Sequence, residues 1–284
     1  MGRIVYVNGD YVDEAEAKVS VFDRGFLFAD GVYEVTSVLE GKLIDFDGHC
    51  RRLGRSLGEL DMPSPISDED LLEAHRELVR RNGVEEGVIY LQITRGAEDR
   101  DFAWSEDLTP TVVLFTQSKS IVDAPLAKRG AKVISIDDKR WARRDIKTVQ
   151  LLWPSLAKME AKKAGADDAW MIEDGHVTEG TSNNAYIVTG DGTIVTRHLS
   201  ESILHGITRA AVLRFAREAQ MRIEERAFTI EEAKAAAEAF TTSASGFVTP
   251  VVEIDGVALG GGTPGPVATR LREIYLAESR KRAI

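Results

Sequence analysis

One lysine in this sequence stands in surroundings that favour chemistry at its amine. Lys147 lies in the stretch 145–152, Asp-Ile-Lys-Thr-Val-Gln-Leu-Leu, which is unusually apolar for a charged side chain. Apolar surroundings disfavour an ammonium group, and a neutral lysine amine can form a Schiff base with a carbonyl compound. Taken by itself, the commoner outcome is a lysine at a strand edge whose amine extends to water.

A second run combines one carboxylate with small hydrogen-bonding side chains. Residues 177–184 read Val-Thr-Glu-Gly-Thr-Ser-Asn-Asn and follow a predicted strand. We expect a loop there that suits a polar ligand, with Glu179 able to pair with a protonated ring nitrogen. A plain loop of turn-forming residues explains the run equally well.

Three segments have the composition of a phosphate site. Residues 205–209, His-Gly-Ile-Thr-Arg, precede an apolar-periodic helix whose first N–H groups and dipole attract anions. Residues 241–246, Thr-Thr-Ser-Ala-Ser-Gly, form a predicted hydroxyl-rich loop. Arg51–Arg52, at the predicted end of a strand, would add positive charge with bidentate geometry. Each segment also has an ordinary explanation, as a helix N-cap, a turn or a solvated face.

Composition and charge argue against several classes of protein. The 36 basic and 46 acidic residues give a net charge of −10, which argues against nucleic-acid or membrane-surface binding. No apolar run approaches the ~20 residues of a membrane span, and no signal-peptide core follows the N-terminus. Cys50 is the only cysteine, which favours a reducing, cytoplasmic location. The five histidines lack metal-ligand spacing, and no Gly-x-Ser-x-Gly occurs, so we expect no metal site and no serine hydrolase.

The pattern of elements predicts an α+β chain. Its 284 residues suit about two domains, and we expect an N-terminal domain 1–119, a linker 120–125 and a C-terminal domain 126–284. Predicted helices cover 67–82, 154–164 and 208–220, with others beginning at 229 and 266. Predicted strands cover 33–39, 42–46, 88–94, 111–116, 132–136, 169–172, 176–177, 185–188 and 193–196.

Taken in order, these features resemble the fold-type IV pyridoxal-phosphate enzymes. That family contains D-amino-acid transaminases, branched-chain aminotransferases, (R)-selective amine transaminases and 4-amino-4-deoxychorismate lyases. The closest overall likeness is to the D-amino-acid transaminases, and it covers nearly the whole chain. The segments that carry the resemblance are residues 23–26, 30–34, 49–53, 92–96, 145–147, 178–183 and 206–209. The resemblance implies the two-domain α+β fold of that family, with the cofactor pyridoxal 5'-phosphate in the cleft between the domains.

The resemblance also implies a role for each matching residue. Lys147 is similar to the Schiff-base lysine that shuttles the substrate proton, and Glu179 to the partner of the pyridinium nitrogen. A frequent threonine is replaced by Ala244, so we expect somewhat weaker phosphate binding. The phosphate residues implied are Arg52, Ile207, Thr208, Ser243 and Ala244. The whole cofactor-binding set implied is Arg52, Lys147, Glu179, Thr181, Ser182, Asn183, Ile207, Thr208, Ser243 and Ala244.

Substrate recognition is implied by a tyrosine and a short loop. Tyr33 and Arg100 match residues that bind the donor carboxylate, the arginine reaching in from the neighbouring subunit of a homodimer. Phe102 stands where those enzymes have a histidine, so one charge-assisted hydrogen bond, about 1.5–3 kcal/mol, is missing. The flanking Asp99 and Asp101 could draw Arg100 into a salt bridge. We therefore expect looser selection for a carboxylate and a more apolar pocket.

The implied function is a ping-pong transaminase that moves the amino group of a D-amino acid, such as D-alanine or D-glutamate, to a 2-oxo acid. The alternatives are an (R)-selective amine transaminase, a branched-chain L-amino-acid aminotransferase and aminodeoxychorismate lyase. A non-catalytic cofactor-binding or structural dimer is the alternative outside enzymes. Only the lyase would release pyruvate catalytically with no amino acceptor present.

Overall fold

The structure is a computed structural model that describes residues 2–284. Its contacts divide the chain into two compact units. Unit 1 holds the residues up to Ser120, the short segment Ile146–Gln150 and the last three residues; unit 2 holds Ile121–Asp145 and Leu151–Lys281. Lys147 therefore belongs to unit 1, although it comes after the first strand of unit 2 in the sequence. No helix within residues 2–284 is long and apolar enough to cross a bilayer.

Unit 1 is built on a six-stranded antiparallel sheet. The strand order is β2-β1-β6-β5-β3-β4, and β3, β5 and β6 pair along most of their lengths. Side chains alternate between the two faces of such a sheet, so each strand contributes to both. The strands are β1 (Ile4–Val7), β2 (Asp10–Asp13), β3 (Gly31–Leu39), β4 (Lys42–Ile44), β5 (Glu86–Thr94) and β6 (Thr111–Ser118).

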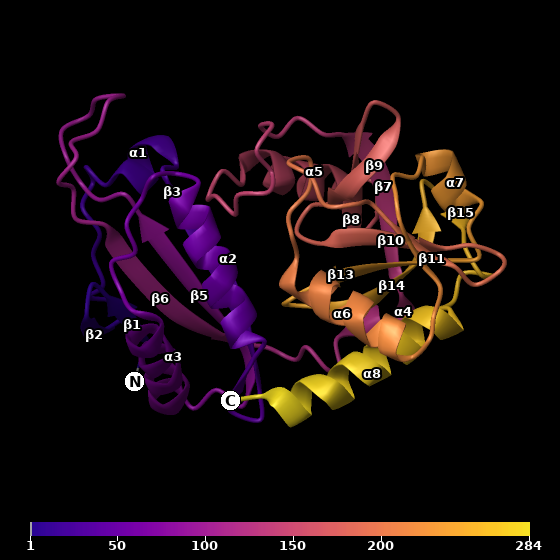
Figure 1. Ribbon diagram of the computed structural model, residues 1–284, viewed down its shortest axis with the longest axis horizontal. Helices are drawn as coiled ribbons and strands as arrows, with labels where there is room; N and C mark the ends of the chain where they lie inside the picture. Colours follow the sequence, from indigo (N-terminus) through magenta and orange to yellow (C-terminus); the bar gives the residue numbers. More distant parts are fainter. Residues whose placement is uncertain (1) are drawn as a thin grey trace. The chain divides into compact units, whose positions relative to one another are not determined.

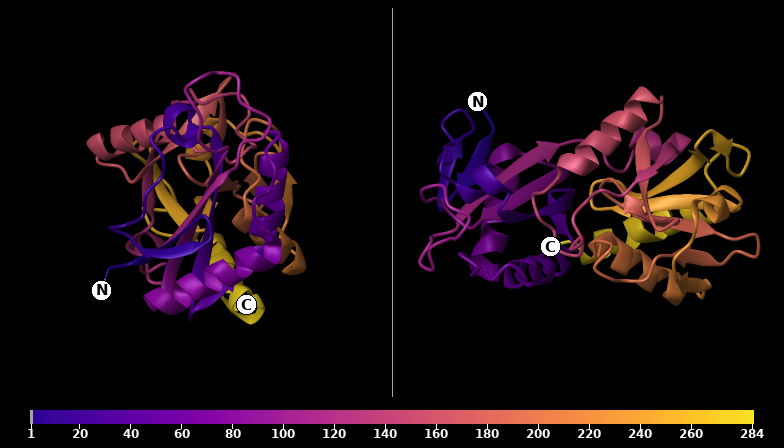
Figure 2. Two further views of the ribbon diagram at one scale, coloured as in Figure 1. Left: turned by 90° about the vertical axis from the view of Figure 1, so that its left-hand side faces the viewer. Right: turned by 90° about the horizontal axis from the view of Figure 1, so that it is seen from above.

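Helices cover one face of this sheet. Figures 1 and 2 show α2 (Phe46–Gly58) and α3 (Asp68–Asn82) on the same side of the strands, and α1 (Arg24–Phe28) is a single short turn. The prediction of α3 is confirmed: Ser67 caps it by accepting the Asp70 N–H. The placement of Arg51–Arg52 at a strand end is wrong, because both residues lie on α2, whose apolar residues recur at helical spacing.

Unit 2 is built on a nine-stranded mixed sheet. The order is β12-β11-β10-β13-β14-β7-β8-β9, with β15 beside β14, and the pairs β14–β7, β7–β8 and β11–β12 are parallel. Apolar residues from most of these strands form a buried cluster around Trp170 and Phe228. The strands are β7 (Ala131–Asp137), β8 (Asp168–Glu173), β9 (His176–Gly180), β10 (Asn184–Val188), β11 (Ile194–Thr196), β12 (Ile223–Glu225), β13 (Glu238–Ser243), β14 (Phe247–Ile254) and β15 (Val257–Ala258).

Helices of unit 2 pack against different parts of its sheet (Figure 1). α6 contacts β13, α5 contacts β7 and β8, and Arg272 of α8 donates to the carbonyls of Gly246 and Val248. Thr229 caps α7 by accepting the Glu232 N–H, as its spacing predicts. The helices are α4 (Pro125–Arg129), α5 (Leu152–Lys163), α6 (Ile207–Glu218), α7 (Ile230–Lys234) and α8 (Pro266–Arg282).

Two predicted loops of unit 2 are partly strand. Glu179 lies inside β9, and Thr241–Ser243 are the end of β13, so the sequence-based loop assignment is wrong at these residues. Small polar residues are more typical of turns than of strands, so the sequence does not predict these strand ends unless the pairing strand is known. The α+β fold class is confirmed.

Candidate functional site

Lys147 is held against the first residues of β3. The Tyr33 N–H donates to the Lys147 carbonyl at 2.9 Å, and the Val149 N–H donates to the Gly31 carbonyl at 3.1 Å. The Lys147 N–H donates to the hydroxyl of Ser56 at 3.3 Å. Its Nζ atom lies 4.0 Å from the centroid of the Tyr33 ring. The backbone therefore fixes this lysine so that its amine rests on an aromatic ring.

The Tyr33 ring belongs to a stack on the face of the sheet opposite α2. Its centroid lies 5.5 Å from that of Tyr90, which lies 4.9 Å from that of Phe115, and both pairs are inclined by 24°. Burial raises the pKa of Tyr90, so its hydroxyl stays protonated and donates to Gln92 at 2.8 Å. The result is a firm, half-buried aromatic wall beside the amine of Lys147.

Arg52 is locked in place by a buried carboxylate from β3. Its Nε and Nη2 atoms donate to the two oxygens of Glu34 at 2.8 and 2.6 Å, and His49 Nδ1 lies 2.7 Å from the same carboxylate. Burial alone would raise the pKa of Glu34, but the Arg52 charge and the hydrogen bonds from Arg52 and His49 lower it to about 2. Arg52 thus keeps one orientation, which an anion site requires.

Arg100 lies on the exposed loop that follows β5. Its guanidinium carbon is 5.2 Å from the Phe28 ring centroid and 5.6 Å from that of Phe102, which is 77% exposed. Within residues 2–284, neither Asp99 nor Asp101 forms a salt bridge with Arg100. The diversion of this arginine by its acidic neighbours is therefore absent from the structure.

Glu179 of unit 2 is a buried carboxylate that accepts hydrogen bonds from three other segments. Arg140 Nη1 donates to it at 2.6 Å, Asn184 Nδ2 at 2.9 Å and the Leu204 N–H at 3.1 Å. Arg140 also donates to Asp138, whose side chain is fully buried, at 2.7 Å. Burial raises the pKa of Glu179, and the contributions of Arg140 and Leu204 only partly offset it.

Asn184 joins Glu179 to two other segments. It lies opposite Thr242 in the β10–β13 pairing, and its Nδ2 also donates to the Leu204 carbonyl at 3.0 Å. A Cβ on Gly206, the N-cap of α6, would come within 2.1 Å of the Asn184 oxygen, so a larger residue there would displace the Asn184 amide. The structure therefore gathers β9, the start of α6 and the end of β13. The predicted phosphate residues on these segments are Ile207, Thr208, Ser243 and Ala244.

The loop between β9 and β10 is held by a carboxylate of β8. The Thr181 hydroxyl and the Asn183 amide donate to Asp168 at 2.5 and 2.7 Å, and Lys158 pairs with the same carboxylate at 3.2 Å. Ser182, between the two, is exposed. The side chains of Thr181 and Asn183 thus fix the loop, and their predicted contact with a cofactor stays a prediction.

Sequence reasoning missed the partners of the two buried glutamates. Arg140 stands in the charged run Asp-Lys-Arg, which is typical of a solvated surface, and nothing in its spacing points to Glu179. His49 has no feature in the sequence that predicts its contact with Glu34. Asn184 carried the one usable signal, because an amide that opens an otherwise apolar strand needs a buried partner.

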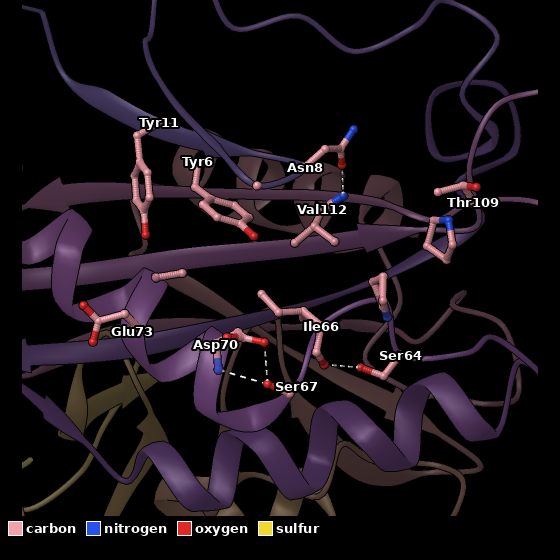
Figure 3. Close-up of a pocket in the computed structure, with 14 residues that line it drawn as sticks. Tyr6, Asn8, Tyr11, Ser64, Ile66, Ser67, Asp70, Glu73, Thr109 and Val112 are labelled. Carbon is pink, nitrogen blue, oxygen red and sulfur yellow. Dashed lines mark hydrogen bonds between the residues drawn. The ribbon is translucent and has the colours of Figure 1, made fainter.

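A separate hollow lies between the β1–β2 hairpin and the start of α3 (Figure 3). It has a volume of about 890 Å³, and the rings of Tyr6 and Tyr11 face Asp70 and Glu73 across it. Burial, with the nearby charge of Asp70, raises the pKa of Tyr6. None of the predicted site residues lines this hollow, so it is distinct from the residues described above.

Comparison with known proteins decides the family. The sequence matches the family Amino-transferase class IV over residues 31–254, from the first residue of β3 to the last of β14. The chain belongs to this family. It is therefore an aminotransferase, and the matched region includes Lys147, Arg52 and Glu179.

Curated proteins and solved structures agree with this family. The chain is 38% identical to "D-alanine aminotransferase" of Staphylococcus aureus (strain N315) over 95% of both chains, and 38% identical to that of Bacillus licheniformis over 98% and 99%. It is similar to the T.th. branched-chain amino acid aminotransferase complexed with N-(5'-phosphopyridoxyl)-L-glutamate, with a TM-score of 0.90 at 31% identity, covering 99% and 95% of the two chains. The Thermoproteus uzoniensis branched-chain aminotransferase with norvaline gives 0.87 at 29%, covering 97% and 94%.

Proposed function

We propose that this chain is a D-amino-acid aminotransferase that uses pyridoxal 5'-phosphate to move an amino group from a D-amino acid to a 2-oxo acid. The observation that carries the proposal is the amine of Lys147 lying on the Tyr33 ring in a chain of this family. The relatives named D-alanine aminotransferase support a D-amino-acid donor. Pyridoxamine 5'-phosphate and a phosphopyridoxyl compound in structures of the T.th. relative support the cofactor.

The residues of each unit suit particular groups of this cofactor. Arg140 divides its charge between Glu179 and Asp138, so the pair of carboxylates favours a further cation such as a protonated ring nitrogen. The first turn of α6 has no side-chain cap and suits a phosphate, and Arg52, whose Nε and Nη2 atoms are bound to Glu34, would add positive charge. The full set that we propose for the cofactor is Arg52, Lys147, Glu179, Thr181, Ser182, Asn183, Ile207, Thr208, Ser243 and Ala244.

The chemistry follows from the residues around the amino donor. Bound pyridoxal phosphate supplies a sink for the electron pair left when the donor loses its Cα proton. The Nζ amine of Lys147 takes that proton as a general base and holds it for return as a general acid. The ring of Tyr33, fixed by its stack with Tyr90, restricts the directions that this amine can adopt. The carboxylate of Glu179 would stabilise positive charge at the ring nitrogen of the bound cofactor.

We assign recognition of the donor carboxylate to Tyr33 and Arg100. Arg100 has no carboxylate partner within residues 2–284, which leaves its guanidinium available for one from the substrate. Phe102 adds an apolar surface where a histidine would add a hydrogen bond, and this favours donors with apolar side chains. The amino acceptor is a 2-oxo acid, which binds through the same carboxylate contacts.

We further propose a homodimer in which Arg100 serves the neighbouring subunit. Exposed apolar side chains support this assembly, since such surfaces mark protein interfaces. In unit 1 they are Val19, Val21, Phe22, Phe26, Phe102 and Trp104; in unit 2 they are Leu152, Leu156 and Met159, on one face of α5. A cytoplasmic location is supported by Cys50, the single cysteine.

A branched-chain aminotransferase is the second candidate, because the similar solved structures carry that name. One experiment separates the donors. Holoenzyme without acceptor is mixed with D-alanine, L-leucine or an (R)-aryl amine, and the visible absorbance of the bound cofactor is followed. Loss of absorbance with D-alanine supports the proposal, and loss mainly with L-leucine or the (R)-amine contradicts it. Catalytic release of pyruvate from 4-amino-4-deoxychorismate would indicate the lyase.

The role of Lys147 has its own test. We expect Lys147→Ala to lose the visible absorbance of the lysine-bound cofactor and nearly all turnover, because no other amine rests on the Tyr33 ring among the described residues. Thermal unfolding of the variant measures whether the fold persists. Retained transaminase activity in a folded Lys147→Ala protein would defeat this mechanism.

A further inference from the structure

Arg24 is buried in unit 1, although it opens the short helix α1 at the edge of the sheet. Its side chain is 4% exposed. Nε donates to Asp30 at 2.9 Å, and Nη1 donates to Glu98 at 3.2 Å and to the Asp101 carbonyl at 2.7 Å. Nη2 donates to the Phe102 carbonyl at 3.2 Å. Every nitrogen of this guanidinium has a partner, and two of the four partners are carbonyls of the loop that carries Arg100.

That loop, residues 98–104, is called the specificity loop here. Aromatic rings hold it from the inside: the guanidinium carbon of Arg24 lies 4.6 Å from the Phe28 centroid and 5.6 Å from that of Trp104. A second arginine, Arg95, lies 3.9 Å from the Trp104 centroid. Two cations thus stack on the ring that ends the loop.

Asp30 ties this arrangement to the strand that carries Tyr33. One oxygen of Asp30 accepts from Arg24 Nε at 2.9 Å and from Arg95 Nε at 2.8 Å, and β3 begins at the next residue. The two arginines face two carboxylates, Asp30 and Glu98, so the cluster is neutral. Burying four charged groups has a desolvation cost. An exposed loop can fold without such a buried cluster, so the cluster indicates a role beyond folding.

We infer that Arg24 is a positioning residue for recognition of the donor carboxylate, because it fixes the specificity loop and thereby the direction of Arg100. This inference rests on the proposed function. Arg100 itself is exposed and lies near the rings of Phe28 and Phe102. A lysine at position 24 keeps the charge but lacks the planar fork that reaches two carbonyls and a carboxylate together.

The test compares Arg24→Lys, Arg100→Gln and the double variant with Arg80→Met as the matched control. Arg80 is an exposed arginine of α3 that pairs with Glu77, far along the chain from the loop. With holoenzyme we expect Arg24→Lys to raise the KM for D-alanine about tenfold and to change kcat less than about twofold. In the double variant the two effects should not add, since Arg24 acts through Arg100.

A second readout does not depend on turnover. Amide hydrogen exchange of the specificity loop should accelerate in Arg24→Lys and stay unchanged in Arg80→Met and Arg100→Gln. If Arg24→Lys lowers kcat by as large a factor as it raises KM, or if its effect adds to that of Arg100→Gln, Arg24 has only a structural role and the inference is overturned. Wild-type protein that does not transaminate D-amino acids would instead overturn the proposed function, and the exchange result would still report whether Arg24 orders the loop.

Discussion

Two buried glutamates, one in each unit, meet their arginines in different ways. Arg52 grips Glu34 with two nitrogens, at 2.8 and 2.6 Å. Arg140 reaches Glu179 only through Nη1, at 2.6 Å, and gives Nε and Nη2 to Asp138. Burial acts to raise the pKa of both glutamates. The partners of Glu34 overcome this effect, and its pKa falls to about 2. The partners of Glu179 do not, and its pKa is raised.

This difference indicates that Glu34 serves the fold, and it supports the role that we propose for Glu179 beside a cationic ligand. Around Glu179, Arg144 pairs with Glu173 at 2.7 Å and approaches Asp138 at 3.6 Å. Glu173 is thus paired with Arg144 and also lies near the charge of Arg197, whereas the buried carboxylates of Asp138 and Glu179 divide the guanidinium group of Arg140 between them. A buried carboxylate with only part of an ion pair is costly, so we expect Glu179 to favour a further cation.

The largest effect on stability is expected when Arg52 is removed from its ion pair with Glu34. Arg52→Met should lower the free energy of unfolding by about 3–5 kcal/mol, because Glu34 is then a buried carboxylate without its main partner. Chemical denaturation of the cofactor-free protein measures this loss. Arg51→Met, at the exposed neighbouring position of α2, is the matched control and should be close to neutral.

Adding Glu34→Gln to Arg52→Met should recover part of the stability, since the uncompensated charge disappears with it. If Arg52→Met unfolds at the same denaturant concentration as Arg51→Met, the ion pair does not stabilise unit 1 and the contrast with Glu179 loses its basis.

The second prediction concerns acid. The pKa of Glu34 lies near 2 in the folded protein, below its usual 4.5, so its stabilisation is complete above about pH 4.5 and is lost as the pH falls toward 2. The loss amounts to about 3 kcal/mol. Unfolding free energies measured from pH 6 to pH 2 should fall in the wild type and vary less in Glu34→Gln. Parallel pH curves for the two proteins would contradict the lowered pKa.

These two regions also show what sequence reasoning can find. Lys147 and Glu179 stand out locally, the lysine by its apolar neighbours and the glutamate by the small residues after it. Ser67 and Thr229 predict the starts of their helices, because each side chain accepts a hydrogen bond from a backbone N–H in the first helical turn. In each case the signal and the residue that produces it lie within a few positions of each other.

The remaining partners come from segments that only the fold brings together. Arg140 lies 39 residues before Glu179, and Glu34 lies 18 residues before Arg52. Arg52 in turn lies on α2, where the sequence predicts the end of a strand. An ion pair leaves no periodic pattern in the sequence. Its members then look like ordinary surface charges until the sheet register is known.

The third prediction separates function from stability at Glu179. Glu179→Gln should lower kcat/KM at least about a hundredfold, about 3 kcal/mol, because the negative charge at the ring nitrogen is lost. The cofactor-free variant should nevertheless be more stable than the wild type at pH 7. The folded protein holds the Glu179 proton more tightly than the unfolded chain, so this group costs stability as the pH rises above about 4.5.

Steady-state kinetics and thermal unfolding measure the two effects on one protein. Glu218→Gln, on the exposed face of α6, is the control that should change neither. A Glu179→Gln protein that is both inactive and less stable at pH 7 would mean that Glu179 is satisfied without a cofactor, as Glu34 is.

The smallest effect is expected from making Glu179 resemble Glu34. Asp138→Asn removes the carboxylate that competes for Arg140, so the pKa of Glu179 should fall. The change also removes the stabilisation of Asp138 by Arg140 and Arg144, which lower the pKa of Asp138, so the net change in unfolding free energy at pH 7 should be below about 1 kcal/mol. The same change reduces the demand for a further cation, and pyridoxal phosphate should bind several-fold more weakly. Titration calorimetry of the cofactor-free protein measures this affinity, with Asp137→Asn, its exposed neighbour, as the control. Tighter cofactor binding in Asp138→Asn would show that sharing Arg140 hinders the site, and that the incomplete pair is a cost of the fold.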